Sequence, residues 1–283
     1  MSMPRDLVLV RHGESEGNLA TQAAREGDLH FYTDAFTTTP GHRWRLTPTG
    51  AAQAQTIGAW LRSEFPQTQP DQPGFDLMMV SPYVRARETA ADLALPNAAW
   101  VSNRALRERD WGDIGSMVRE EFEHDPRFVE NARMKRHDPL YWVAPGGESV
   151  AQVAEDRVRN VLDTLHREAS DQRVLCVTHG ELMWAMRLVL ERWSDEDFAA
   201  RDSDRHYRIG NGEAIHYSRT DPRSGLLAPR LAWVRTATPH RLNDGTWTVR
   251  VSPWGAFTRR TESNEDLLSS VHDVPHLYTD HSR

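Results

Sequence analysis

The sequence predicts an α/β fold: a three-layer α/β/α sandwich around a mainly parallel central sheet. Short apolar runs that fit buried strands alternate with longer amphipathic segments that fit helices. This alternation is typical of parallel sheets covered by helices on both faces. The chain has 283 residues, enough to bury a large core, and we expect one domain over residues 1–255. Residues 256–283 are polar, and we expect a C-terminal extension that packs on the surface or is partly mobile.

The first half of the chain predicts two strands and the helix between them. Residues 6–10, DLVLV, read as a buried strand. A helix is expected over 46–65, because apolar residues recur there at helical spacing. Thr47 fits its N-cap and Pro48 its first position. FDLMMV at 75–80 is the second strand, since it is apolar and bounded by turn-forming residues.

The second strand is followed by a helix over 81–95, for which Ser81 fits the N-cap. A strongly amphipathic helix is expected over 148–169, where valines and leucines form one apolar stripe. RVLCVT, residues 173–178, is a third buried strand, and the next helix covers 181–193. Two late strands near a sheet edge are expected over 213–219 and 230–236.

Two long segments fit no regular element well and read as insertions, at about 19–45 and 113–147. Both are polar with interspersed aromatic residues, and the second is rich in basic residues. Connections this long in a compact domain are usually functional covers or disordered segments. Each is therefore either a solvated loop or a cover that helps to choose the substrate.

Charge and composition exclude several classes of partner. The formal net charge of −7 argues against a general nucleic-acid binder, so an anion site must be built locally. No apolar run approaches the roughly 20 residues that a membrane span needs, so we expect no membrane partner. The single cysteine, Cys176, cannot form an internal disulfide, which favours a cytoplasmic setting.

Three polar motifs begin where apolar strands stop, at residues 11–14, 81–85 and 178–181. Ligand sites of parallel sheets lie outside the carboxyl ends of the strands, so these motifs should meet. Arg11 and Arg85 are permanently charged and match phosphate oxygens, and helix N-termini also favour anions. The motifs predict a phosphate pocket that needs no metal.

An imidazole in such a pocket can act as a nucleophile. Neutral histidine attacks phosphorus through one ring nitrogen while the other donates a hydrogen bond that fixes the tautomer. His12 and His179 lie in the strand-end motifs. A leaving alkoxide then needs a proton, and the carboxylate candidates are Glu108 and Asp110.

Five motifs occur in order along the chain: RHGESEGN, SPYVRARETA, LRERDWGDIG, PGGES and VTHGE. Together they resemble the histidine phosphatase superfamily, in its phosphoglycerate mutase-like branch 1. The resemblance runs from about residue 5 to about residue 219. It implies a phosphoglycerate mutase-like fold for the catalytic domain, and chemistry without a cofactor.

The resemblance also implies roles for individual residues. His12 would become phosphohistidine, while Glu108 would donate the proton, with its pKa raised under a covering segment. Asp110 is the competing proton donor. Further contacts to the phosphoryl group or to the rest of the substrate are implied for Arg11, Asn18, Arg85, Arg109 and His179.

Hydrolysis is the function that the sequence favours, acting on a small phosphorylated metabolite or another phosphomonoester. The alternative is a cofactor-dependent phosphoglycerate mutase; a catalytically inactive binding protein is a third reading. The chain departs from the mutase pattern, because no TGW-type segment follows RHGESEGN and Trp111 stands where tyrosine is expected. We expect no nucleic-acid partner, and leave open whether a second copy of the chain pairs with the first.

Overall fold

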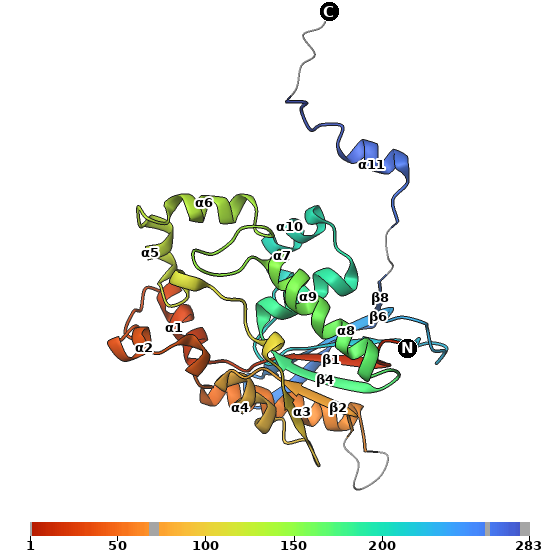
Figure 1. Ribbon diagram of the computed structural model, residues 1–283. Coiled ribbons are helices and arrows are strands. Elements are labelled where there is room, and N and C mark those ends of the chain that lie inside the picture. The colour runs from red at the N-terminus through yellow and green to blue at the C-terminus, as the bar shows by residue number, and fades with distance from the viewer. Residues whose placement is uncertain (1, 68–73, 258–260, 278–283) are drawn as a thin grey trace, which may run out of the picture.

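The computed structural model describes residues 2–67, 74–257 and 261–277, and its centre is one twisted sheet (Figure 1). The strand order is β3-β2-β4-β1-β5-β6-β7, and β8 pairs with β6. The strands are β1 (Asp6–Arg11), β2 (Leu77–Val80), β3 (Trp100–Ser102), β4 (Arg173–Thr178), β5 (Ala214–Ser218), β6 (Trp233–Arg241), β7 (Trp247–Val251) and β8 (Gly255–Ala256). The first four are parallel and form the core of the sheet, which β5 to β8 continue in antiparallel pairing. The predicted α/β class is confirmed.

Helices and helical turns occupy most of the remaining described chain. The α-helices are α1 (Glu16–Arg25), α2 (Asp34–Thr38), α3 (Pro48–Glu64), α4 (Val84–Asp92), α5 (Arg119–His124), α6 (Val129–His137), α7 (Val150–Gln152), α8 (Arg159–Glu168), α9 (Gly180–Glu191), α10 (Asp195–Ser203) and α11 (Asn264–Ser270). A π-helical turn, η4 (Val153–Val158), joins α7 to α8. The 3₁₀ turns are η1 (Gly41–Arg43), η2 (Arg104–Leu106), η3 (Gly112–Ile114) and η5 (Arg205–Tyr207).

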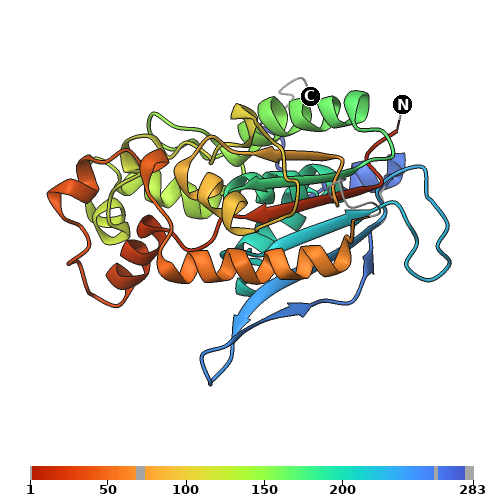
Figure 2. The same cartoon turned by 90° about the horizontal axis from the view of Figure 1, so that it is seen from below.

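The parallel centre of the sheet buries both of its faces, because the inner positions of β1, β2 and β4 are apolar. Val8 and Val10 face a core made with α3 and α4, which includes Ile57. Leu7 and Leu9 alternate with them and face a second core, made with η4, α8 and α9. Figure 2 shows α3 and α8 on opposite sides of the sheet, which gives the three layers.

The predicted helix over 46–65 is confirmed, whereas the N-cap at Ser81 is wrong. Thr47 caps α3, since its hydroxyl accepts from the backbone N–H of Gly50 at 3.1 Å. The helix after β2 begins only at Val84, with Tyr83 at the cap position. Ser81 lies nearer the sheet, and its hydroxyl bonds to an imidazole across the strand ends instead, as described below.

The helix expected over 148–169 is continuous but not α-helical throughout. Ser149 and Gln152 form a capping box at its start, with bonds of 2.8 and 3.0 Å. The next six residues, η4, wind as a π-helical turn before α8 resumes. Such turns are rare and often lie at functional sites. This turn contains Arg157, whose contacts with the site are described below.

Both insertions contain short helices, so the expectation that they are irregular was wrong. Residues 19–45 hold the end of α1, then α2 and η1, while 113–147 hold α5 and α6. The second insertion has its own apolar cluster, formed by Phe122, Ala132, Trp142 and Ala144. Helices of five to ten residues are too short for hydrophobic periodicity to identify. The two insertions lie side by side in both views (Figures 1 and 2).

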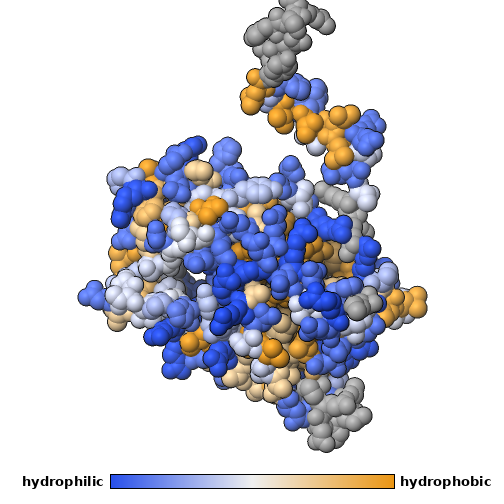
Figure 3. All heavy atoms as spheres, in the orientation of Figure 1, coloured by the Kyte–Doolittle hydropathy of each residue, from blue (hydrophilic) through white to orange (hydrophobic). Residues whose placement is uncertain are grey.

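The chain after the predicted strand at 230–236 forms more sheet than expected, because β6 runs on to Arg241 and pairs with β7. Beyond it, every described residue from 261 to 277 is exposed. Figure 1 shows α11 standing away from the sheet, and Figure 3 shows apolar side chains on its surface. Among the described residues, no helix is long and apolar enough to cross a membrane.

A close contact between α3 and α4 gives a test of this packing. A Cβ on Gly58 would lie 2.1 Å from the carbonyl oxygen of Leu93, a backbone atom that cannot move away cheaply. We expect Gly58→Ala to lower the free energy of unfolding by roughly 1–3 kcal/mol, the usual effect of overpacking. The gain of about 0.5–1 kcal/mol from replacing a helical glycine is smaller. Urea denaturation measures the change.

Gln55→Ala on the exposed face of α3 is the control, and its effect should stay within about 0.5 kcal/mol. A Gly58→Ala protein as stable as the unmodified chain would contradict the close packing of the two helices.

Candidate active site

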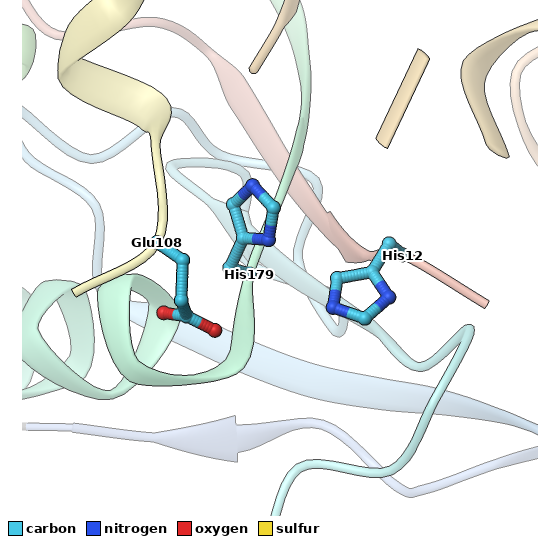
Figure 4. Close-up of side chains that lie close together, drawn as sticks. All are labelled: His12, Glu108 and His179. Carbon is cyan, nitrogen blue, oxygen red and sulfur yellow. The ribbon is translucent and has the colours of Figure 1, made fainter. Parts of the chain in front are cut away.

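The predicted site residues meet at the carboxyl ends of the parallel strands. His12 follows β1, His179 follows β4, and Glu108 follows the turn η2 after β3. One nitrogen or oxygen atom from each of the three side chains lies within 4.8 Å of the other two. Figure 4 shows the ring of His179 between Glu108 and His12. The arrangement brings together the two imidazoles of the strand-end motifs and the carboxyl group of Glu108, one of the two candidate proton donors.

The imidazole of His12 is held in one tautomer. Its Nδ1 lies 2.7 Å from the carbonyl oxygen of Gly13, which can only accept, so Nδ1 carries the proton. Nε2 accepts a hydrogen bond from Nε of Arg85 at 3.1 Å. The ring is only 2% exposed, and burial, helped by Arg85 and Arg11, holds its pKa well below the usual value. His12 is therefore neutral, with the lone pair of Nε2 directed toward the other site residues.

Two buried guanidinium groups flank this ring. Arg85 donates from Nη1 to the carbonyl oxygen of Gly41, in the first insertion, at 2.6 Å. Arg11 donates from Nη1 to the carbonyl oxygen of Ile209 at 2.6 Å, while its Nε is buried without a partner. A Cβ at Gly180 would lie 3.2 Å from that Nε, so glycine leaves room for it. Both arginines keep N–H groups that an anion can accept.

His179 is fully buried and bonds to a residue that the sequence did not single out for the site. Its Nε2 lies 2.7 Å from the hydroxyl of Ser81. That hydroxyl accepts from the N–H of Tyr83 at 3.3 Å, so its own proton is free to go to Nε2. The proton of the ring then lies on Nδ1, which is buried without a partner. Burial and the positive charge of Arg85 hold its pKa well below the usual value, so the ring is a neutral donor.

Glu108 has the environment of a general acid. Its Oε1 accepts from the backbone N–H of Arg109 at 2.9 Å. Burial and the neighbouring Glu181 raise its pKa, although Arg85 and Arg11 oppose this. Asp110, by contrast, is exposed, and its Oδ1 accepts from the N–H of Gly112 at 2.9 Å. The geometry favours Glu108 over Asp110 as the proton donor.

Asn18 is largely engaged in holding the chain together. Its Oδ1 accepts from the N–H of Ser15 at 3.1 Å, in a capping box at the start of α1. The same atom accepts from Nδ2 of Asn211 at 2.9 Å. Only the amide NH₂ of Asn18 is left to meet a ligand, and its contact with a phosphoryl group stays a prediction.

Arg109 holds two parts of the chain together. Each of its guanidinium nitrogens bonds to the chain: Nε to the carbonyl oxygen of Glu148, Nη1 to Glu181 and Nη2 to the carbonyl oxygen of Trp142. It is only 4% exposed and lies against the rings of Trp111 and Trp142. This guanidinium joins the second insertion to α9, and its contact with a substrate stays a prediction.

The three clustered side chains are close enough to hold a metal ion, but the charges beside them favour an anion. Nε2 of His12 is already bonded to Arg85, and Arg11 places a second positive charge beside the ring. Arg85 and Arg11 also act on the charge of Glu108. A divalent cation would be repelled by both guanidiniums, whereas a dianion would be attracted.

Arg85 should contribute strongly to turnover of a phosphate ester. We expect Arg85→Ala to lower kcat/KM for p-nitrophenyl phosphate by about 10²-fold, as does removal of one donor to a developing anion. Arg223→Ala, at an exposed turn, is the matched control and should leave the rate unchanged. Equal losses in the two variants would remove Arg85 from the site.

Comparisons with known proteins agree with this geometry. The model of the histidine phosphatase superfamily (branch 1) matches residues 7–208. The phosphoglycerate mutase-like protein AT74 of Arabidopsis thaliana is 30% identical over 254 residues, 81% of this chain and 74% of that protein. A 2,3-bisphosphoglycerate-dependent phosphoglycerate mutase of Methylobacterium radiotolerans is 32% identical over 197 residues, covering 67% and 80%. The fold is similar to that of a mycobacterial glucosyl-3-phosphoglycerate phosphatase, with a TM-score of 0.56, 21% identity and coverage of 89% and 99%.

Proposed function

This chain belongs to the histidine phosphatase superfamily (branch 1), and we propose that it acts as a phosphomonoester hydrolase through a phosphohistidine on His12. One observation carries the proposal: a neutral His12 whose unprotonated Nε2 accepts a hydrogen bond from Arg85, the guanidinium that would pass to the phosphoryl oxygens, beside Arg11 and a carboxyl of raised pKa. A neutral imidazole with a fixed tautomer is the form that attacks phosphorus. The structure thus supports nucleophilic catalysis without a proton first being removed from the nucleophile.

The first chemical step transfers the phosphoryl group to the enzyme. Nε2 of His12 forms a bond to phosphorus as the bond from phosphorus to the ester oxygen breaks. Glu108 acts in its protonated form, which burial favours by raising its pKa, and gives its proton to the leaving oxygen. The products of this step are an alcohol, a phosphohistidine and the Glu108 carboxylate.

The second step returns the enzyme to its starting state. Water attacks phosphorus, and the Glu108 carboxylate accepts one of its protons. The bond between phosphorus and Nε2 breaks, which restores neutral His12 and releases inorganic phosphate. In both steps Arg11, Arg85 and Nδ1 of His179 donate to the phosphoryl oxygens, where charge gathers in the transition state.

Hydrolysis is favoured over mutase activity by the pairing of the arginines near the acid. A mutase needs free cations for the second phosphate and the carboxylate of its substrate. Arg107 and Arg157 both bond to the carboxylate of Glu148, and Arg109 bonds to Glu181. Each of these three guanidiniums is already paired with a carboxylate, which supports a substrate that is a small metabolite or other ester with one phosphoryl group to be held.

Mutase activity is the second candidate, because relatives about 30% identical to this chain are named 2,3-bisphosphoglycerate-dependent phosphoglycerate mutases. The discriminating experiment measures phosphate release from a panel of phosphorylated metabolites and from p-nitrophenyl phosphate, with a chelator present. Interconversion of the two monophosphoglycerates, with the bisphosphate as primer, is followed in parallel. Interconversion faster than hydrolysis would overturn the proposal, and no reaction in either assay would indicate a binding protein.

A further inference from the structure

The loop that carries Glu108 is held by two side chains that neither β1 nor β4 supplies. The carboxylate of Glu148 accepts from Arg107 Nη2 at 2.7 Å and from the N–H of Asp110 at 2.9 Å. It also accepts from Nη2 of Arg157 at 2.7 Å. Glu148 thus bonds to the residues on both sides of the Glu108–Arg109 pair.

The side chain of Arg157 also bonds to the backbone of this loop. Its Nη1 donates to the carbonyl oxygen of Arg107 at 2.7 Å, and its Nη2 lies 3.4 Å from the carbonyl oxygen of Glu108 itself. The side chain is 6% exposed, and burial lowers its pKa while Glu148 raises it. A positive charge is buried here at a cost in solvation. Nη1 and Nη2 of Arg157 donate to the loop that carries Glu108 and to Glu148, whereas Nε is buried without a partner among the described residues.

The backbone around this pair is packed too closely to allow other arrangements. Gly112 has a positive φ of 51°, and a Cβ on it would lie 2.0 Å from the carbonyl oxygen of Pro145. A Cβ on Gly147 would lie 2.3 Å from the carbonyl oxygen of Asp110. The N–H of Glu148 completes the contact by donating to that same oxygen at 2.9 Å. The 145–148 segment is therefore in close backbone contact with the loop that carries Glu108.

The π-helical turn η4 supplies Arg157 to this unit. The chain is α-helical before η4 and after it, so the π turn is confined to residues 153–158. Three further residues of this turn, Val153, Ala154 and Val158, are buried in the core. Arg157 instead bonds to the loop that carries Glu108. A π turn has a less favourable geometry than an α turn, and a functional position of one side chain is the usual reason for it.

We propose that Glu148 and Arg157 are positioning residues that fix the carboxyl of Glu108 against the ester oxygen. The inference rests on the proposed function, because it assigns these residues to the proton-transfer step. Within the described residues, the carboxyl of Glu108 accepts one hydrogen bond, from the N–H of Arg109, so the direction of the carboxyl depends on the loop. A carboxyl displaced by about 1 Å would lose most of its catalytic advantage, on the order of 10²-fold.

The test compares two esters that differ in their need for an acid. In Glu148→Gln, an amide NH₂ that can only donate replaces one carboxylate oxygen that accepts. The NH₂ would face an N–H donor, so a bond to the loop is lost. We expect hydrolysis of glycerol 2-phosphate to fall by about 10- to 100-fold, and that of p-nitrophenyl phosphate by less than about threefold. The ratio of the two rates does not depend on the fraction of folded enzyme, so partial unfolding cannot imitate this result.

The matched controls are Glu155 and Arg159, two exposed residues of the same continuous helix as Arg157. Glu155→Gln and Arg159→Gln should leave the ratio unchanged, while Arg157→Gln should shift it in the same direction as Glu148→Gln. Arg157→Lys keeps the charge and should recover part of the ratio. If Arg157→Gln does not fold, Arg157→Lys and Glu148→Gln still decide the matter.

A double variant separates positioning from a general loss of activity. With Glu108→Gln already in place, adding Glu148→Gln should change the glycerol 2-phosphate rate by less than about twofold, because there is no acid left to position. Additive losses, or an unchanged ratio in Glu148→Gln, would overturn the inference and leave the proposed function standing. A wild-type chain that hydrolyses neither ester would overturn both.

Discussion

Replacing His12 by alanine should abolish hydrolysis of p-nitrophenyl phosphate, with a loss of at least about 10⁴-fold, the scale on which nucleophile deletions act. The ring is the proposed nucleophile, because a hydrogen bond from Nδ1 fixes its tautomer and leaves Nε2 unprotonated beside Arg85. Water cannot replace it efficiently, because the remaining groups stabilise the phosphoryl oxygens without attacking phosphorus. Initial rates of nitrophenol release measure the effect.

The intermediate itself gives a second readout for the same variant. Brief incubation with a ³²P-labelled ester, followed by alkaline quenching, should leave an acid-labile label on the wild-type protein and none on His12→Ala. His166→Ala, at an exposed histidine of α8, is the control and should keep both label and turnover. Full activity in His12→Ala would exclude the phosphohistidine mechanism.

Three of the residues proposed to act on the phosphoryl group could be located from the sequence, because Arg11 ends β1 and His12 and His179 directly follow β1 and β4. Strand registry fixes where β1 and β4 end: Arg11 pairs with Thr178, so the residues after them must be neighbours. The imidazoles of His12 and His179 accordingly have ring centroids 5.1 Å apart. Because these residues lie so close to the strand ends, the position of each strand in the sheet determines the position of the residue. The sequence pattern is therefore enough to locate such residues.

The residues around the acid could not be predicted in the same way. Arg109 is next to Glu108 in the sequence, yet its guanidinium turns to Glu181 on α9 and to a carbonyl of the second insertion. Ser81 reads as a helix cap but bonds to His179, 98 positions away. Such directions depend on contacts between distant segments, and no local pattern encodes them.

The positive charges are also distributed in a way that composition does not show. The chain carries a net charge of −7, yet two guanidiniums lie buried within reach of one neutral imidazole. Burial, and after it the charges of Arg85 and Arg11, lowers the pKa of His12, which keeps the proposed nucleophile unprotonated. The same two charges would attract a phosphate dianion, so in the proposed mechanism one pair of arginines would serve both binding and the protonation state of His12.

Glu108→Gln should affect esters according to how much protonation their leaving oxygen needs. For glycerol 2-phosphate we expect a loss of about 10³-fold, within the usual range for a general acid. For p-nitrophenyl phosphate the loss should be at most about tenfold, because nitrophenolate leaves without a proton. Asp110→Asn is the matched control, since Asp110 is exposed and bonds to its own turn. If both esters lose rate equally in Glu108→Gln, Asp110 becomes the candidate acid.

The pH dependence of the wild-type enzyme tests the role of Glu108 as the acid independently. Glu108 must be protonated to act as an acid, so the rate with glycerol 2-phosphate should fall as pH rises through its raised pKa. His12 must be neutral, and since its pKa is well below the usual value, loss of rate on the acidic side should come only at low pH. Between these limits the two groups are in the states that the first step requires. The fall at higher pH should disappear in Glu108→Gln, because glutamine does not titrate, and its persistence there would assign it to another group.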